Sequence, residues 1–84
     1  MKIKLSTKLG SLQLDVKRLS VATYHDSKRE EVSVNFDDEA VSFPAFEAIK
    51  SIGVECYHIG KNAPCGPSVL IYPNPNINFK FKTL

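Results

Sequence analysis

Apolar side chains recur at alternate positions along residues 2–17, KIKLSTKLGSLQLDVK, and they change parity once, near Gly10. Alternation of this kind is typical of β-strands that bury one face. Gly10 and Ser11 suit the central positions of a type II′ turn, in which glycine supplies the positive φ angle. The pattern therefore predicts a β-hairpin that pairs Leu9 with Leu12 across this turn.

Further stretches alternate in the same way. LSVATYH and VSVNF lie on either side of the polar segment HDSKREE and predict a second hairpin. With Asp26 and Ser27 at its turn, Val21 faces Val32. The runs VECYHI, SVLIY and INFKFKTL predict three more strands towards the C-terminus.

One segment, DDEAVSFPAFEAIKSIG, has a helical pattern. Ser42 is a suitable N-cap, Phe46 and Ile49 share one face, and Gly53 fits the left-handed residue that follows a helix. We expect a helix over about 43–52. A helix of this length is too short to be stable alone, so it must pack on a sheet.

The predicted fold class is α+β. About seven short strands, in the order ββββ-α-βββ, form a mostly antiparallel sheet with the short helix packed on one face. The 84 residues make a single domain, 1–84. A chain of this size buries only ~60% of its unfolded surface, so one compact core is expected and a deep, enclosed substrate cavity is not.

The chain start carries early lysines, as a signal peptide does, but Lys8 interrupts it before an apolar segment can form. No apolar run is long enough to span a bilayer. We therefore expect a cytoplasmic protein without a membrane partner. Thiols are kept reduced in that compartment.

Cys56, His58 and Cys65 are the densest group of reactive side chains in the chain. Cys56 and His58 are two positions apart on a predicted strand, so they share a face, and thiolate and imidazole are ligands that zinc prefers. The segment lacks the Cys-x-x-Cys knuckle of zinc motifs. A small structural zinc protein is therefore an alternative, against the commoner role of cysteine as a small buried apolar residue.

The same cysteines allow two further interpretations. A disulfide between Cys56 and Cys65 closes a short loop, although reducing conditions oppose it. Cys65, near Lys61, has the positive neighbour that lowers the pKa of a thiol, but no base is placed beside it by the spacing. We therefore expect neither an enzyme nor a cofactor.

Lysines recur on the outward positions of the first hairpin and of the last strand: Lys2, Lys4, Lys8, Lys17, Lys80 and Lys82. If the two ends of the chain pair, these lysines form one basic stripe that can neutralise phosphates, which makes a nucleic-acid-binding protein an alternative. Lysine also protects edge strands from aggregation. Phe79 and Phe81 point inward, so the stripe lacks aromatic side chains for base stacking.

A second set of charged and aromatic residues is predicted to contact a protein partner: Tyr24, Lys28, Arg29, Asp37, Asp38 and Glu39. Uneven charge of this kind steers protein association, and Tyr57 and Tyr72 are further candidate anchors because tyrosine combines large contact area with a polar tip. The acidic run has a structural explanation too, since carboxylates stabilise the start of a helix. It lacks the spacing of a calcium loop.

The leading hypothesis is a small non-enzymatic protein-binding module that acts by occupying a partner surface. An inhibitor or accessory protein is the expected kind, because small α+β proteins of this size are frequent among phage and mobile-element proteins, including anti-restriction and anti-CRISPR inhibitors. A monomer is expected, or a homodimer that pairs through the exposed edge of the first or last strand.

Overall fold

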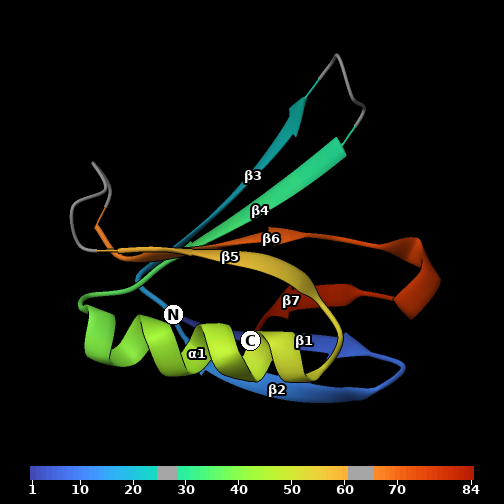
Figure 1. Ribbon diagram of the computed structural model, residues 1–84, viewed down its shortest axis with the longest axis horizontal. Coiled ribbons are helices and arrows are strands. Elements are labelled where there is room, and N and C mark those ends of the chain that lie inside the picture. The colour runs from blue at the N-terminus through green and yellow to red at the C-terminus, as the bar shows by residue number, and fades with distance from the viewer. Residues whose placement is uncertain (25–28, 61–65) are drawn as a thin grey trace.

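The computed structural model describes residues 1–24, 29–60 and 66–84 (Figure 1). Its elements, in chain order, are β1 (Lys2–Thr7), β2 (Gly10–Asp15), β3 (Arg18–Tyr24), β4 (Arg29–Asn35), α1 (Glu39–Ser51), β5 (Glu55–Ile59), β6 (Ser68–Tyr72), the short 3-10 helix η1 (Pro75–Ile77) and β7 (Lys80–Thr83). The predicted α+β class and the order ββββ-α-βββ are confirmed. In the described residues, no helix is long and apolar enough to cross a membrane.

The strands form two antiparallel sheets where the sequence suggested one. A three-stranded sheet has the order β2-β1-β7, and a four-stranded sheet has the order β3-β4-β6-β5. Figure 1 shows the first sheet below the second, with α1 running alongside β5. The first and last strands pair, as expected, but β1 is the central strand of its sheet. The idea that β1 offers a free edge for dimerisation is therefore wrong.

The first hairpin forms with a different register from the one predicted. Thr7 is paired with Gly10, so Lys8 and Leu9 are the central residues of the turn. The predicted pairing of Leu9 with Leu12 is wrong, and Leu9 is 64% exposed. The register differs by an even number of residues, so the strands keep their buried faces.

Contacts with the end of α1 explain this register. The Thr7 hydroxyl accepts a hydrogen bond from the Leu9 backbone N–H (3.0 Å) and donates one to the carbonyl oxygen of Ile52 (2.7 Å). Leu9 lies over Gly53, where an added Cβ would stand 2.7 Å from the Leu9 side chain. The position of the turn thus depends on contacts with a segment more than 40 residues away. Turn preferences of the local sequence cannot predict such contacts.

The second hairpin has the predicted register. Val21 faces Val32, and Leu19 faces Val34. Its predicted turn residues, Asp26 and Ser27, lie outside the described residues. Figure 1 shows that β3 and β4 extend together beyond the rest of the molecule.

The helix begins four residues earlier than predicted. Asp38 is the N-cap, and its carboxylate accepts a hydrogen bond from the Val41 backbone N–H at 3.2 Å. Ser42, the predicted cap, lies inside the helix and is fully buried. The predicted end is correct, because Gly53 follows α1 with a φ of 85°.

The core lies between the inward faces of the two sheets and α1. Its largest fully buried side chains are Ile3, Leu5, Val32, Val34, Ile49, Val69 and Ile71. The last strand is shorter than predicted, because Asn78 adopts a left-handed conformation (φ 54°) after η1. Phe79 and Phe81 still pack against the core, as the alternation indicated.

Candidate functional site

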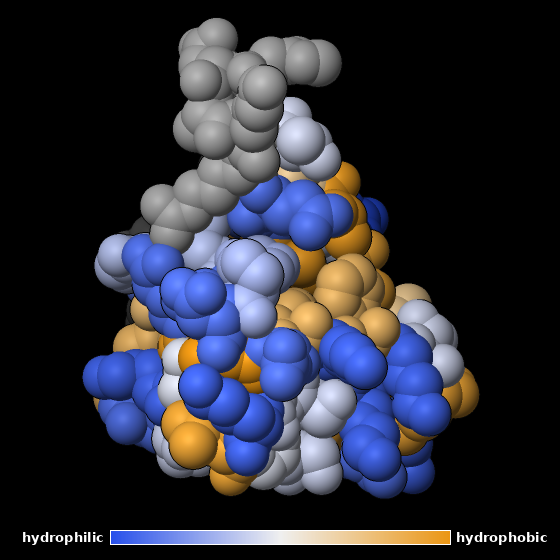
Figure 2. Space-filling model, turned by 90° about the vertical axis from the view of Figure 1, so that its right-hand side faces the viewer, coloured by the Kyte–Doolittle hydropathy of each residue, from blue (hydrophilic) through white to orange (hydrophobic). Residues whose placement is uncertain are grey.

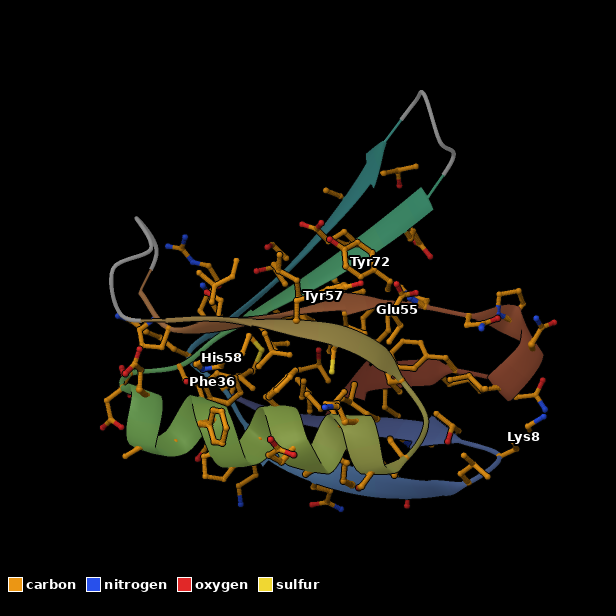
Figure 3. The ribbon with its side chains drawn as sticks, viewed as in Figure 1. Lys8, Phe36, Glu55, Tyr57, His58 and Tyr72 are labelled. Carbon is orange, nitrogen blue, oxygen red and sulfur yellow. The ribbon has the colours of Figure 1, made fainter. Side chains whose placement is uncertain are left out.

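Two tyrosines stand together on the face of the four-stranded sheet that points away from α1 (Figure 3). Strand alternation turns Cys56 and His58 of β5 towards the helix and leaves Tyr57 on the outer side. In the pairing of β5 with β6, Tyr57 is opposite Leu70 and Glu55 is opposite Tyr72. We call this surface the tyrosine face; it consists of Glu31, Glu55, Tyr57, Leu70 and Tyr72.

Hydrogen bonds and ring contacts hold the two tyrosines in place. Their rings meet edge to face, with centroids 5.6 Å apart and an interplanar angle of 73°. The Tyr72 hydroxyl donates to Glu31 (2.8 Å), and the Tyr57 hydroxyl donates to Glu55 (3.3 Å). Tyr57 is nevertheless 54% exposed. The arrangement is therefore ordered before any partner arrives, which lowers the entropic cost of binding.

The chemistry of the tyrosine face suits a cation. Aromatic ring faces attract ammonium and guanidinium groups, and Arg forms paired hydrogen bonds with carboxylates. Glu31 and Glu55 supply carboxylates beside the rings of Tyr57 and Tyr72. Tyrosine is also among the residues that contribute most to protein interfaces.

The opposite face of β5 carries Cys56 and His58, which share a side as predicted. The His58 ring nitrogen Nε2 is 2.7 Å from the Ser42 hydroxyl, and the ring lies against Phe43 and Phe46 at centroid distances of 5.6 and 5.8 Å. The Cys56 thiol is directed at the carbonyl oxygen of Phe46 (3.9 Å). Burial raises the pKa of the Cys56 thiol from 9.0 to about 11.

These contacts give both residues partners within the protein. Among the residues that the structure describes, no group of three His, Cys, Asp or Glu side chains is close enough to hold a metal ion. Cys65, the third ligand of the zinc hypothesis, lies outside the described residues, as do the proposed disulfide and the Cys65 nucleophile. Cys56 is a free thiol.

Four of the six lysines predicted to form a stripe do share one surface. Lys2 and Lys4 of β1, and Lys80 and Lys82 of β7, occupy outward positions on the three-stranded sheet, and we call this surface the lysine face. Lys8 lies in the β1–β2 turn instead. Lys17 follows β2, and its ammonium group is 3.9 Å from the carboxylate of Asp37.

The predicted acidic contact residues lie at the start of α1. Asp38 caps the helix, and Asp37 is beside Lys17. Glu39 occupies the first turn, where acidic side chains complement the helix dipole. The side chains of Tyr24, Lys28 and Arg29, on the projecting hairpin, lie outside the part of the chain that can be described.

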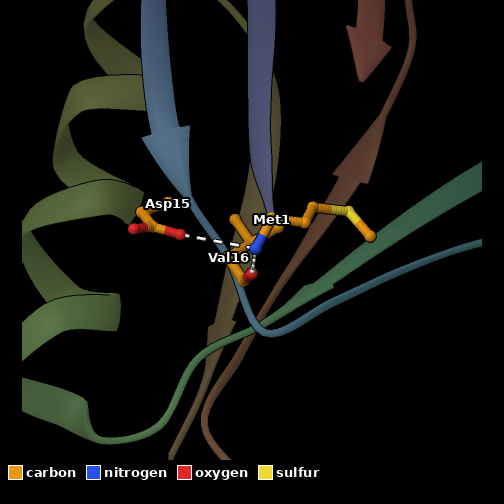
Figure 4. Close-up of polar contacts among 3 residues, drawn as sticks. All are labelled: Met1, Asp15 and Val16. Atoms are coloured by element: carbon orange, nitrogen blue, oxygen red, sulfur yellow. Dashed lines mark hydrogen bonds and ion pairs between the residues drawn. The ribbon is translucent and has the colours of Figure 1, made fainter. Parts of the chain in front are cut away.

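The N-terminal ammonium group lies in an open hollow of about 380 Å³, which is lined by Met1, Asp15, Val16, Lys17, Phe36, Asp37 and Val41. It donates to the Val16 carbonyl oxygen at 2.9 Å and is 3.5 Å from the Asp15 carboxylate (Figure 4). Both charged pairs around this hollow are thus formed within the protein, and it does not resemble a ligand site.

Comparison with protein-family models, curated proteins and solved structures gave no match for this chain.

Proposed function

We propose that the protein is a small, non-enzymatic protein-binding module of the inhibitor or accessory kind, as in anti-defence proteins of phage. It acts by occupying a surface of its partner, which it contacts through the tyrosine face. The observation that carries this proposal is the edge-to-face pair of Tyr57 and Tyr72 on an outer sheet face, in which Tyr57 is exposed. Tyr57 is the exposed member of the pair and Tyr72 is half-buried beside it, so the pair offers a partner a large aromatic surface with a polar tip.

The partner surface is cationic. Carboxylates flank both tyrosines, so an Arg or Lys side chain of the partner gains a ring face and a carboxylate at once. The hairpin residues Tyr24, Lys28 and Arg29 belong to the same proposal, because β4, which contains Glu31 of the tyrosine face, is one strand of that hairpin. A cytoplasmic setting, which keeps thiols reduced, completes the proposal.

Photo-cross-linking at one position tests this function. Replacement of Tyr57 by p-benzoylphenylalanine keeps a large aromatic group on the tyrosine face. In cells that make the protein, we expect irradiation to give one protein adduct of defined mass. The added substitutions Glu31→Gln and Glu55→Gln should abolish it, because they remove the charges that attract the partner.

A matched control carries the same photoreactive group at Glu47, which is exposed on α1. Glu47 lies outside the tyrosine face, so this position should give no adduct. Equal adducts at both positions, no adduct at position 57, or an adduct that persists without the two carboxylates would each contradict the proposal.

A further inference from the structure

The lysine face brings like charges together. Lys4 and Lys82 are direct cross-strand partners. Lys80 lies two positions before Lys82, on the same side of β7. Like charges directly opposite one another destabilise a sheet. Within the described residues, no carboxylate forms an ion pair with Lys4, Lys80 or Lys82. Lys2 differs in having an acidic residue, Asp15, as its cross-strand partner, although the ion pair of Asp15 is with the N-terminal ammonium group.

The same three lysines surround an open hollow. It has a volume of about 300 Å³ and is lined by Lys4, Ser6, Lys80, Phe81 and Lys82. Along a strand, side chains on one face repeat every ~6.6–6.8 Å, and neighbouring strands are ~4.8 Å apart. The three lysine side chains thus start close together around a depression that the described residues leave open.

We propose that the lysine face binds the phosphate backbone of nucleic acid. Lys4, Lys80 and Lys82 contact phosphates, and the displaced counterions supply the favourable free energy. The hydroxyl of Ser6 and the amide of Gln13, on the same outer face, are groups that bond phosphates and sugars. This binding is a second activity, separate from the protein contact proposed above.

The other residues of the face favour nucleic acid over a membrane surface. A protein that lies on a membrane inserts apolar side chains between the headgroups. The outward positions of β1 and β2 carry lysine, serine, glutamine and aspartate instead. Figure 2 views the end of the molecule where Figure 1 places the β1–β2 turn, and hydrophilic residues cover most of the lower part of that end.

The mode of contact follows from the aromatic residues. Phe79 and Phe81 contact each other at an interplanar angle of 39° with centroids 6.0 Å apart, and both pack against the core. Phe81 lines the hollow, but both rings are partly buried by these contacts, whereas the aromatic residues of base-stacking proteins are exposed. The lysine face therefore contacts the charged phosphates and does not distinguish base sequences. Its affinity for nucleic acid depends on salt concentration.

Fluorescence anisotropy with a labelled 20-nucleotide DNA of mixed sequence, single-stranded and then as a duplex, tests this inference across a salt series. We expect binding whose logarithmic affinity falls linearly with the logarithm of salt concentration. The triple variant Lys4→Gln, Lys80→Gln, Lys82→Gln should lose about tenfold or more in affinity at low salt. Its salt slope should be smaller by about two to three units.

The matched control is Lys8→Gln, Lys17→Gln, Arg18→Gln, which removes three positive charges outside the lysine face. It should keep most of the affinity and the slope. Equal losses in both variants would show attraction to overall charge and overturn the proposal. Binding to phosphatidylserine vesicles without binding to DNA would also overturn it, as would no binding to DNA at low salt.

Discussion

Burial, and not the spacing of reactive side chains, determines the chemistry of Cys56. The sequence correctly placed Cys56 and His58 on one side of a strand. It did not show that α1 covers that side. There the Ser42 hydroxyl forms a hydrogen bond with the His58 imidazole, and the Cys56 thiol is directed at the carbonyl oxygen of Phe46. A raised thiol pKa is the opposite of what a nucleophilic cysteine requires.

Thiol reactivity checks this environment. In a Cys65→Ser variant, which leaves Cys56 as the remaining cysteine, we expect alkylation by iodoacetamide at pH 8 to be ~100-fold slower in the folded protein than in urea. A pKa of about 11 leaves a thiolate fraction ~100-fold smaller than a pKa of 9.0 does. Equal rates in the two states would show that Cys56 is not buried.

At the residue scale, the tyrosine face was partly predictable. Tyr57 and Tyr72 were each recognisable as candidate anchors, and alternation in ECYHI and SVLIY indicates their sides. Their contact depends on the register of β5 with β6, in which Glu55 is opposite Tyr72. In the sequence, β5 ends at Ile59 and β6 begins at Ser68, so no short turn fixed that register.

Among the elements, α1 shows how capping chemistry sets a boundary. Both Asp38 and Ser42 are residue types that cap helices. The apolar pattern favoured Ser42, but the structure uses Asp38, whose backbone is extended (φ −152°). The longer helix places Ser42 inside, facing His58. A pattern of apolar residues therefore located the helix but not its first turn.

A pair of neighbouring substitutions tests this boundary. Asp38→Ala should lower the free energy of unfolding by about 1 kcal/mol, because it removes the acceptor for the Val41 N–H. For a domain of this size the loss corresponds to a decrease in Tm of about 4–8 °C. Thermal unfolding followed by circular dichroism measures it.

Asp37→Ala is the control for this prediction. It removes the same charge, and the contact of Asp37 with Lys17 is long and exposed, so a change within about 0.5 kcal/mol is expected. A larger effect of Asp37→Ala than of Asp38→Ala would place the helix start elsewhere.

For the whole molecule, the lysine face and the two carboxylates of the tyrosine face belong to different sheets. Their inner faces share one core, so the lysine face and the tyrosine face lie on opposite sides of it. A net charge of +2 conceals this separation. The alternating pattern predicted the strands and their buried sides, but the division into two sheets depends on long-range pairings, β1 with β7 and β4 with β6, that no local pattern encodes.

The central claim is that the tyrosine face binds a cationic protein surface. The most direct test is an NMR titration of the isotope-labelled protein with a tetra-arginine peptide, read from backbone amide and tyrosine ring signals. We expect saturable shifts that cluster at Glu31, Glu55, Tyr57, Leu70 and Tyr72, and that weaken in the Glu31→Gln, Glu55→Gln variant. Shifts that gather at Asp37 and Glu39 instead, or that spread evenly without saturation, would contradict the claim.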